Sequence, residues 1–476
     1  MRKIPFSPPD ITQAEIDEVV KVLKSGWITT GPETKLFESR IAEYCNVERA
    51  ACLSSQTSCA ELTLRILGIG PGDEVILPAY TYTATASIVY HVGAKPVMID
   101  CKSGSFEMDY DKMEAAINHN TKAIIPVDLA GVICDYDRIF EAVERQKSVF
   151  KPKNEIQEKF GRVIVMADGA HAFGARRKGK MCGEIADFTN FSFHAVKNMT
   201  TAEGGAAVHR PHEWLDEDDI YKQYMLLSLH GQTKDAYQKN KVASWEYDVV
   251  DTQYKCNMPD VLAALGVVQL QRYEKILERR HELIRVYNEE FKDLPIQVLN
   301  HCDENHRSSG HLYFVRFIGK DDEYRNKFYN MMAENGVMCN VHFKPLPMLS
   351  AYKKRGFKIS DYPNTYNMHK NQLTLPLNTT MSDDDAWYVI ETFKPCIEKG
   401  YDIVAFAISE DMSTSANVMR LAAQELNAED KIKVIDSANL STGIGHQVVE
   451  AAIMAQHGMN AVSYTHLRAH ETTLHL

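Results

Sequence analysis

The chain of 476 residues lacks the long apolar runs and the cysteine patterns that mark several specialised protein classes. No uninterrupted apolar run approaches the roughly 18 residues of a membrane span. The N-terminal sequence MRKIPFSPPDIT reaches proline and aspartate before an apolar segment develops, so no signal peptide is predicted. The ten cysteines form no CxxC pair, so we predict no disulfide framework and no metal site. We expect reduced, mostly buried thiols in a cytoplasmic protein.

An excess of positive charge is also absent. The chain has 53 Lys and Arg residues against 64 Asp and Glu residues, a formal net charge of -11. Binding to nucleic acid or to an anionic membrane surface needs a basic face, so neither partner is expected. A hydrophobic content of 45% and a charged content of 25% are typical of a globular protein with an ample core. The length suggests two to four structural units.

Helical patterns alternate with short apolar runs through the first half of the chain. This alternation predicts βαβ units, a mostly parallel sheet and therefore a large α/β domain, for which we take residues 1–257. The predicted helices and strands lie at 13–25, 35–44, 74–77, 95–99, 123–127 and 162–166.

A smaller α+β domain is predicted over residues 258–398. One long helical pattern at 260–291 is expected to lead into it. A strand is predicted at 311–319 and a helix near 322–335. Ser382 precedes three acidic residues, so we predict that it caps a further helix.

Lys197 is the first candidate for chemistry. It follows the β-prone run FTNFSF, and the pair Gly204–Gly205 comes shortly after it. A lysine at a strand end among small residues is able to lie over a bound cofactor. Partial desolvation there lowers the lysine pKa, so that its neutral amine can attack an aldehyde. Taken alone, the residue would more often be an ordinary surface lysine.

Asp168 ends the apolar run RVIVMAD, where parallel α/β folds build their sites. A buried carboxylate beside the ring nitrogen of a pyridine-type cofactor keeps that nitrogen protonated. The alternative is a simple turn residue. His171 lies three positions further on, and it is a candidate hydrogen-bond partner of the cofactor's ring oxygen or else a structural histidine.

A phosphate site and a stacking aromatic are the remaining candidates. Thr57 and Ser58 fall at a predicted helix N-terminus, where free backbone N–H groups and the helix dipole favour an anion. An ordinary helix cap is the alternative. Ser192 is able to add another hydroxyl. Tyr82 follows Pro78 in a loop from which its ring would stack on a flat cofactor, although aromatics in such loops more often belong to the core.

These motifs occur in the order found in a known family. The chain resembles the DegT/StrS family of sugar aminotransferases, which depend on pyridoxal phosphate (PLP) and have the aspartate-aminotransferase fold (fold type I). The resemblance covers residues 3–398. It is carried by SGWITTGPETKLFE, SSQTS, GDEVILPAYTYTATA, ADGAHAFGA, FSFHAVKNMTTAEGG, YKCNMPDVLAALGVVQL and VHFKPLPM.

The resemblance implies a role for each candidate residue. Lys197 is similar to the lysine that bonds the cofactor and shuttles a proton, and Asp168 to the partner of the pyridine nitrogen. The other implied cofactor contacts are Tyr82, His171, Thr57, Ser58 and Ser192, with Asn257 completing the phosphate site of the neighbouring subunit in a homodimer. The implied substrate contacts are Thr30, Gly31, His342 and Lys344. Two positions depart from the family pattern, Gln56 and Gly169.

The implied reaction is a ping-pong transamination. L-glutamate gives its amino group to the cofactor, which passes it to a keto-nucleotide sugar, commonly a 4-keto-6-deoxy hexose, in polysaccharide or amino-sugar biosynthesis. Two alternatives remain open. One is a PLP-dependent sugar dehydratase, although those relatives carry histidine in place of the lysine that this chain keeps as Lys197. The other is a non-catalytic regulatory or binding protein of the same fold.

The sequence character changes after residue 398. A strand, a helix, a second strand and a second helix are predicted over 399–461, and this βαβα segment resembles part of a DegV-type fatty-acid-binding domain. Ser413–Ser415 stand where that family has a Ser-Gly-Thr turn, and a second lobe is missing, so lipid binding is not expected. Residues 462–476 are expected to be a disordered, spurious tail. We hypothesise an assembly chimera, with a natural fusion as the alternative.

Overall fold

The computed structural model describes residues 2–234, 239, 246–398, 403–407, 418–421, 424 and 432–436. The chain divides into two units, Met1–Thr392 and Phe393–Leu476. In the second unit, β14 (Ile403–Ala407) pairs in parallel with β15 (Ile432–Asp436), which confirms both predicted strands. The predicted second helix of this segment and the tail at 462–476 lie outside the described residues.

A seven-stranded sheet forms the centre of the first unit, in the order β1-β9-β8-β5-β4-β2-β3. Strands β3, β2, β4, β5 and β8 are parallel, and β9 and β1 are antiparallel additions. The prediction of a mostly parallel sheet is therefore confirmed. The bounds are β1 Ala50–Leu53, β2 Glu74–Pro78, β3 Lys95–Ile99, β4 Thr121–Ile124, β5 Ile164–Asp168, β8 Phe188–Ser192 and β9 Gly205–His209.

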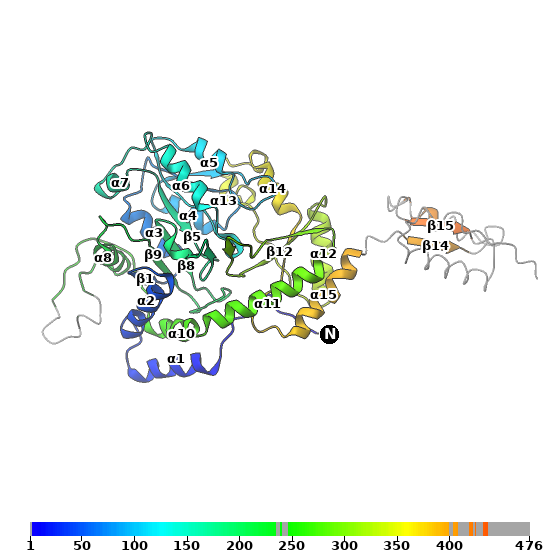
Figure 1. Cartoon of the computed structure of the whole chain (residues 1–476), viewed down its shortest axis with the longest axis horizontal. Coiled ribbons are helices and arrows are strands. Elements are labelled where there is room, and N and C mark those ends of the chain that lie inside the picture. Colours follow the sequence, from blue (N-terminus) through cyan, green and yellow to red (C-terminus); the bar gives the residue numbers. More distant parts are fainter. Residues whose placement is uncertain are drawn as a thin grey trace, which may run out of the picture. The chain divides into compact units, whose positions relative to one another are not determined.

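Helices cover both faces of this sheet (Figure 1). Successive side chains of a strand point to opposite faces. In β5, Val165 packs into one core with α2 (Pro32–Cys45), α5 (Tyr110–Ala116) and α6 (Tyr136–Arg145). Its neighbour Met166 packs into the other core with α3 (Gln56–Ile66), α4 (Thr83–His91) and α8 (Glu217–Ser228). Burial on both faces explains why these strands are apolar throughout.

The single long helix predicted at 260–291 is wrong. The structure has two helices, α10 (Asp260–Gln271) and α11 (Tyr273–Phe291), which follow one another along one edge of the unit (Figure 1). Arg272 between them leaves helical geometry at φ -109°, ψ 9°. Its guanidinium donates to Glu15 Oε1 at 2.7 Å, on α1 (Gln13–Ser25), which packs against α10. The break therefore coincides with a tertiary contact, which hydrophobic periodicity does not register.

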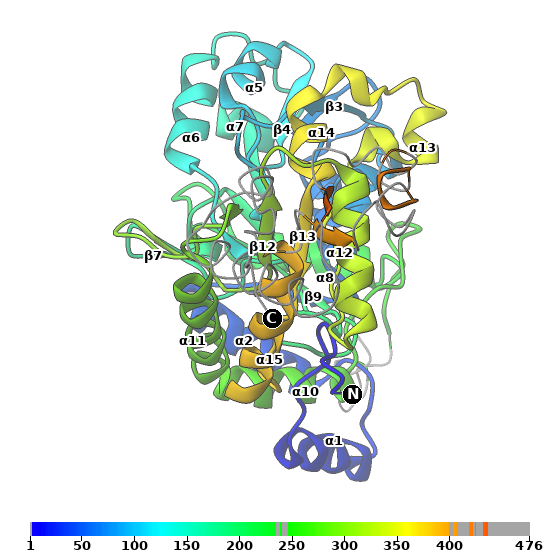
Figure 2. The same ribbon diagram turned by 90° about the vertical axis from the view of Figure 1, so that its right-hand side faces the viewer.

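The smaller sheet is antiparallel, in the order β10 (Ile296–Val298), β12 (Tyr313–Phe317), β13 (Gln372–Leu375). Figure 2 shows α12 (Asp322–Glu334) beside β12 and β13. The predicted helix near 322–335 is confirmed, and the strand predicted at 311–319 is shorter at both ends.

The predicted cap at Ser382 is also confirmed. The backbone N–H of Asp385 donates to Ser382 Oγ at 3.1 Å at the start of α15 (Asp383–Glu398). At the other end of the chain, Ile4 pairs with Val337 beside α12, so the first residues pack against the smaller α+β part and not only against the large domain.

Two strand positions differ from those predicted. The strand predicted at 123–127 is β4 at Thr121–Ile124, and that predicted at 162–166 is β5 at Ile164–Asp168, so β5 carries Asp168 as its last residue. All ten cysteines are free thiols, and all but Cys256 and Cys302 are buried. Within the described residues, no helix is long and apolar enough to cross a membrane, and no group of His, Cys, Asp or Glu is arranged to hold a metal ion.

Candidate active site

A cavity of about 340 Å³ lies at the carboxyl ends of β5 and β8. Its walls come from the end of β5, the loop after β8, the N-termini of α3 and α4, and the residues that precede β12. It brings together the predicted site residues Thr57, Tyr82, Asp168, His171, Ser192, Lys197 and His342. The predicted residues that do not line it are Ser58, Asn257, Thr30, Gly31 and Lys344.

Asp168 lies buried in the floor of this cavity. One carboxylate oxygen, Oδ2, accepts from Thr85 Oγ1 at 2.7 Å, and the other accepts from the backbone N–H of Ala170 at 3.2 Å. Burial raises the pKa of this carboxyl, and the bonds from Thr85 and Ala170 oppose that rise. A carboxylate held in this way is suited to pair with a protonated ring nitrogen. The positive charge of that nitrogen would offset the cost of keeping a buried carboxylate ionised.

Lys197 enters the same cavity from the loop after β8. Its Nζ makes no hydrogen bond or ion pair with any residue that the structure describes. Burial lowers the pKa of its amine to about 8, although the Asp168 carboxylate acts in the opposite direction. A substantial fraction of the amine is therefore neutral near pH 8, and a neutral amine is the form that attacks a carbonyl carbon.

His171 is fixed by the loop that follows β4. Its Nδ1 accepts from the backbone N–H of Ala130 at 3.1 Å. Burial holds the pKa of the imidazole well below its usual value, so the ring is neutral and carries its proton on Nε2. His171 therefore presents a donor, which is what a hydrogen bond to a cofactor's ring oxygen requires.

The N-terminus of α3 forms an anion cradle in the cavity wall. Its first residues, Gln56 and Thr57, line the cavity, and their backbone N–H groups make no hydrogen bond within the described chain. A Cβ at Gly205 would lie 2.4 Å from the backbone N of Gln56, so only glycine lets β9 pass this close to the helix. Ser192, at the end of β8, adds a hydroxyl to the same wall.

Ser58 differs from its predicted role. Its hydroxyl bonds the side chains of Ser54 at 3.1 Å and Ser55 at 2.9 Å, away from the cavity lining. Ser55 is the cap of α3, accepting from the backbone N–H of Ser58 at 3.0 Å, and Ser55 itself lines the cavity. The sequence pattern SSQTS located the helix start but not which hydroxyl faces inward.

Tyr82 stands at the rim of the cavity with 59% of its surface exposed. Its ring lies 5.6 Å from that of Phe343, with a 48° angle between the planes. Phe343 also lies 5.9 Å from the His171 ring. An exposed ring that lines a cavity is available to a flat ligand, and stacking by Tyr82 stays a prediction.

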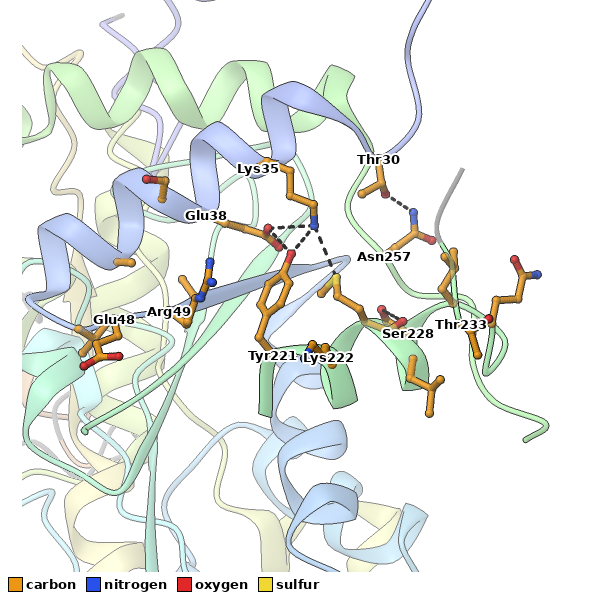
Figure 3. A pocket seen from close by; sticks show the side chains of 18 of the residues that line it. Thr30, Lys35, Glu38, Glu48, Arg49, Tyr221, Lys222, Ser228, Thr233 and Asn257 are labelled. Atoms are coloured by element: carbon orange, nitrogen blue, oxygen red, sulfur yellow. Dashed lines mark hydrogen bonds and ion pairs between the residues drawn. The ribbon is translucent and has the colours of Figure 1, made fainter. Parts of the chain in front are cut away.

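A second, larger cavity of about 580 Å³ holds the predicted residues Thr30 and Asn257 (Figure 3). Asn257 Nδ2 donates to Thr30 Oγ1 at 2.5 Å. At its centre Lys35 Nζ bonds Glu38 at 3.2 Å and the hydroxyl of Tyr221. This cavity therefore has a lysine and a buried carboxylate that already satisfy each other.

Gly31, His342 and Lys344 have separate positions. Gly31 begins α2, and its backbone N–H donates to Asp260 Oδ1 at 2.7 Å, which is a structural role. His342 lines the first cavity, where burial lowers its imidazole pKa to about 3 and its Nδ1 lies 3.0 Å from Thr374 Oγ1. Lys344, two positions after His342 in the sequence, is exposed.

The structure adds lining residues that sequence reasoning missed. Phe6 comes from the N-terminal segment, Phe343 follows His342, and His311 precedes β12. Only the motif VHFKPLPM gave a signal for one of them, Phe343. Phe6 precedes the first family motif, and His311 was predicted only as the first residue of a strand, so no local pattern indicated that either residue lines the site.

Taken together, these residues fit pyridoxal phosphate. The cavity offers a buried carboxylate for a ring nitrogen, a donor imidazole for a ring oxygen, an exposed aromatic for the ring face and unpartnered helix N–H groups for a phosphate. Lys197 supplies the amine for a covalent bond.

Comparison with known proteins agrees with this site. The model of the DegT/DnrJ/EryC1/StrS aminotransferase family matches residues 9–394, and that of the uncharacterised DegV family matches residues 364–472. The spore coat polysaccharide biosynthesis protein SpsC of Bacillus subtilis is 36% identical over 403 residues, which cover 84% of this chain and 98% of SpsC.

Solved structures give the same result. Spr1654 of Streptococcus pneumoniae, assigned as a sugar aminotransferase, has 52% identity and a TM-score of 0.82 in its PMP form, with 83% of this chain and all of that chain covered. It has also been solved in PLP and apo forms. PseC of Helicobacter pylori, an aminotransferase involved in the biosynthesis of pseudoaminic acid, has 25% identity and a TM-score of 0.72, with 84% of this chain and all of that chain covered.

Proposed function

The chain belongs to the DegT/DnrJ/EryC1/StrS aminotransferase family, and on that premise we propose that it transfers an amino group from L-glutamate to a keto-nucleotide sugar. It is a PLP-dependent sugar aminotransferase with fold type I. We propose that the two half-reactions follow a ping-pong order and that the acceptor sugar is a 4-keto-6-deoxy hexose. SpsC, in spore coat polysaccharide biosynthesis, supports a role in cell-surface polysaccharide or amino-sugar synthesis, which we place in the cytoplasm.

One observation carries the proposal. Lys197 and the buried Asp168 face the same 340 Å³ cavity, and within the described chain Lys197 Nζ has no hydrogen-bond or ion-pair partner. A half-buried lysine without a partner gains stability when another group engages it. The pair is therefore arranged for a bound group that lies between an amine and a carboxylate.

The chain's own residues would divide the work as follows. Bound PLP supplies an electron sink. Asp168 would hold a proton on the ring nitrogen, and His171 Nε2–H would donate to the ring oxygen. The N–H groups at the start of α3, with Thr57 and Ser192, would bind the phosphate. In each half-reaction Lys197 Nζ would move one proton between the substrate carbon and the C4′ carbon of the cofactor, accepting it from one and giving it to the other.

We further propose that the active enzyme is a homodimer in which each subunit completes the site of the other. Asn257 lies in the 580 Å³ cavity of its own chain, away from Lys197. Its side chain is partly exposed there beside Thr30. In a dimer, Asn257 would reach the phosphate of the neighbouring subunit, and Ser58 would support the N-terminus of α3 from behind.

Lys197 also separates the proposed reaction from sugar dehydration. Dehydratases of this fold use histidine at the position of the Schiff-base lysine, whereas this chain has Lys197 together with the residues that we propose as cofactor contacts. His342 lines the cavity, and the exposed Lys344 follows it two positions later in the sequence; we assign both to the nucleotide sugar.

The experiment is a transfer assay with ¹⁵N-labelled L-glutamate. The enzyme would be incubated with a panel of keto-nucleotide sugars, and the products would be weighed by mass spectrometry. We expect ¹⁵N in one amino-nucleotide sugar and an equal amount of 2-oxoglutarate. Label in no sugar of the panel, with 2-oxoglutarate still formed from stoichiometric enzyme, would contradict the acceptor class while leaving the donor intact.

A further inference from the structure

A third cavity, of about 370 Å³, lies apart from the residues assigned above to catalysis. Part of its wall is the smaller sheet, where Gln297 of β10 and Arg316 of β12 are paired in register. The rest comes mainly from residues 104–107 and 132–133 and from Arg177 on β6 (Arg176–Arg177). This cavity shares no lining residue with the two cavities described above.

Arg316 is a buried cation, and within the described chain it has no anionic partner. Only 4% of its surface is exposed. Its guanidinium donates to Gln297 Oε1 at 2.6 Å, to Asn371 Oδ1 at 3.2 Å and to the carbonyl oxygen of Asn367 at 3.1 Å. Burial lowers the pKa of this group. Neutral oxygens satisfy its N–H donors but leave its charge uncompensated, which is unfavourable inside a protein.

Arg177 brings an unsatisfied donor to the same cavity. Its Nη2 donates to Asp135 Oδ1 at 2.8 Å. Its Nε is buried and has no hydrogen-bond partner among the residues that the structure describes. A buried donor without a partner costs free energy that a bound acceptor would restore. The preceding residue, Arg176, is exposed and does not line the cavity, because neighbouring side chains of a strand point to opposite sides.

Two acidic side chains also line the cavity, and in the described part of the chain neither is bonded to Arg177 or Arg316. Asp303 pairs with His306, with 2.8 Å between Oδ2 and Nδ1. Glu107 accepts through Oε2 from the hydroxyl of Tyr110, which leaves Oε1 as an acceptor. Glu107 would repel a bare anion, whereas a ligand that also has hydroxyl groups would donate to it.

We propose that this cavity binds a small hydroxylated molecule that carries a phosphate or a carboxylate group. The anionic group would lie against Arg316 and Arg177, because the fork of a guanidinium matches the oxygens of either anion. A hydroxyl of the same ligand would donate to Glu107 Oε1. Sugar phosphates and sugar acids have both features, and a volume of about 370 Å³ lies in the range of small-molecule sites. This site does not depend on the substrates proposed for Lys197.

The test is calorimetric titration of the full-length chain loaded with PLP, so that the anion cradle at the start of α3 is already occupied. Glucose 6-phosphate and gluconate are the probes, and glucose is the uncharged control. All titrations would be made at one ionic strength, because salt screens charge-based binding. We expect one saturable site for at least one anionic probe, with a dissociation constant on the order of 1 mM, and no saturable binding of glucose.

Variants of the two arginines locate the binding. Arg177→Gln and Arg316→Gln should each weaken it by about tenfold, because each removes a charged donor. Arg177→Lys keeps the charge but loses the fork, so its loss should be about threefold. Arg176→Gln removes the same charge from the same strand and should leave the affinity within about twofold. Thermal melts would show which variants fold, and the Arg177 variants suffice if Arg316→Gln does not.

The two probes also distinguish the ligand class. Binding of glucose 6-phosphate alone would assign the site to phosphate esters, and binding of gluconate alone would assign it to sugar acids. Absence of saturable binding of both up to about 20 mM would overturn the proposal. So would equal affinities in the wild type and Arg177→Gln, or an equal loss in Arg176→Gln. Failure of PLP uptake or of sugar transamination would count only against the proposed function, because the dependence on Arg177 is measured by direct binding.

Discussion

The two cavities of the first unit each contain a lysine and a buried carboxylate, but they differ in how those charges are paired. In the larger cavity, Lys35 Nζ lies 3.2 Å from Glu38 Oε2, and Tyr221 donates to the same oxygen at 2.7 Å (Figure 3). In the smaller cavity, Lys197 and Asp168 make no direct bond to each other, and Asp168 is bonded instead by Thr85 and Ala170.

The difference shows that the presence of charges does not by itself identify a reactive site. The Lys35 cluster is closed, because each charge already has its partner, and a ligand would have to break those bonds. The Lys197 site is open, because the half-buried amine has no partner within the described chain. Cavity volume alone, 580 Å³ against 340 Å³, would have selected the wrong site.

The two lysines give the sharpest contrast. We expect Lys197→Ala to lower turnover by on the order of 10⁴-fold, because both the covalent bond to the cofactor and the proton transfer are lost. Lys35→Met removes a lysine of the closed cluster and should leave turnover within about threefold. Steady-state rates, with thermal melts to show that both variants fold, would measure this. Equal losses in the two variants would contradict the distinction between the cavities.

Asp168→Asn should have the next largest effect. The variant keeps an acceptor for Thr85 but has no charge to hold a proton on the ring nitrogen, so we expect turnover to fall on the order of 100-fold. Burial raises the Asp168 pKa, so without cofactor the wild-type fold loses stability as pH rises through that pKa. The Asp168→Asn variant lacks this loss. Thermal melts of the cofactor-free proteins over a range of pH would test this. Melting temperatures that fall in parallel for the variant and the wild type would contradict a raised Asp168 pKa.

The effect of pH on the rate of cofactor uptake should be smaller than the losses of turnover in the Lys197 and Asp168 variants. The Lys197 pKa is lowered to about 8, and only the neutral amine reacts with an aldehyde. Below that pKa the rate of PLP recapture by cofactor-free enzyme should rise about tenfold for each pH unit and then level off above it. Stopped-flow absorbance would give this profile. A rate still rising steeply beyond about pH 10, the range of an ordinary lysine, would exclude the lowered pKa.

Glu38→Ala should affect stability and not chemistry. Glu38 is buried and accepts from the backbone N–H of Cys52 at 3.0 Å as well as from Lys35 and Tyr221. Removing it leaves these donors unsatisfied, so the free energy of unfolding should fall by about 2 to 3 kcal/mol. Denaturant titration would measure the change, and turnover per folded enzyme should stay near the wild-type value. A large loss of turnover would link the two cavities.

Truncation after Gly400 should have the smallest effect. The match to the DegV family covers residues 364–472, so it includes the segment at 399–461. It also overlaps β13 and α15, which lie before the truncation point. We expect the shortened chain to keep its melting midpoint and turnover. Loss of folding would instead favour a natural fusion in which the added segment supports the enzyme.

Sequence patterns were sufficient for the parts of the site that lie within one local motif. The strand ending at Asp168, the loop carrying Lys197 and the helix start at Thr57 each have a local signature, and the structure brings them to one cavity. Ser58 and Gly31 show the limit, because which way a hydroxyl or an N–H faces is decided by tertiary neighbours such as Ser55 and Asp260.

Two further features could not be predicted from the sequence, for the same physical reason. Arg272, at the break between α10 and α11, bonds Glu15, more than two hundred positions away in the chain. The contact between His311 Nδ1 and Asn198 Oδ1, at 2.9 Å, joins two segments that no periodicity connects. Long-range contacts of single side chains leave no repeating pattern, so they are found only once the fold is known.

The most direct test of the account is an absorbance spectrum of the purified full-length chain, taken before and after addition of L-glutamate. We predict a visible band from the covalent bond between Lys197 and PLP, and its loss as glutamate converts the cofactor to its amine form. The Lys197→Ala variant should show no such band, whereas Lys35→Met should show the wild-type one. No band in the wild-type chain after addition of PLP would contradict the claim that Lys197 and Asp168 form a cofactor site.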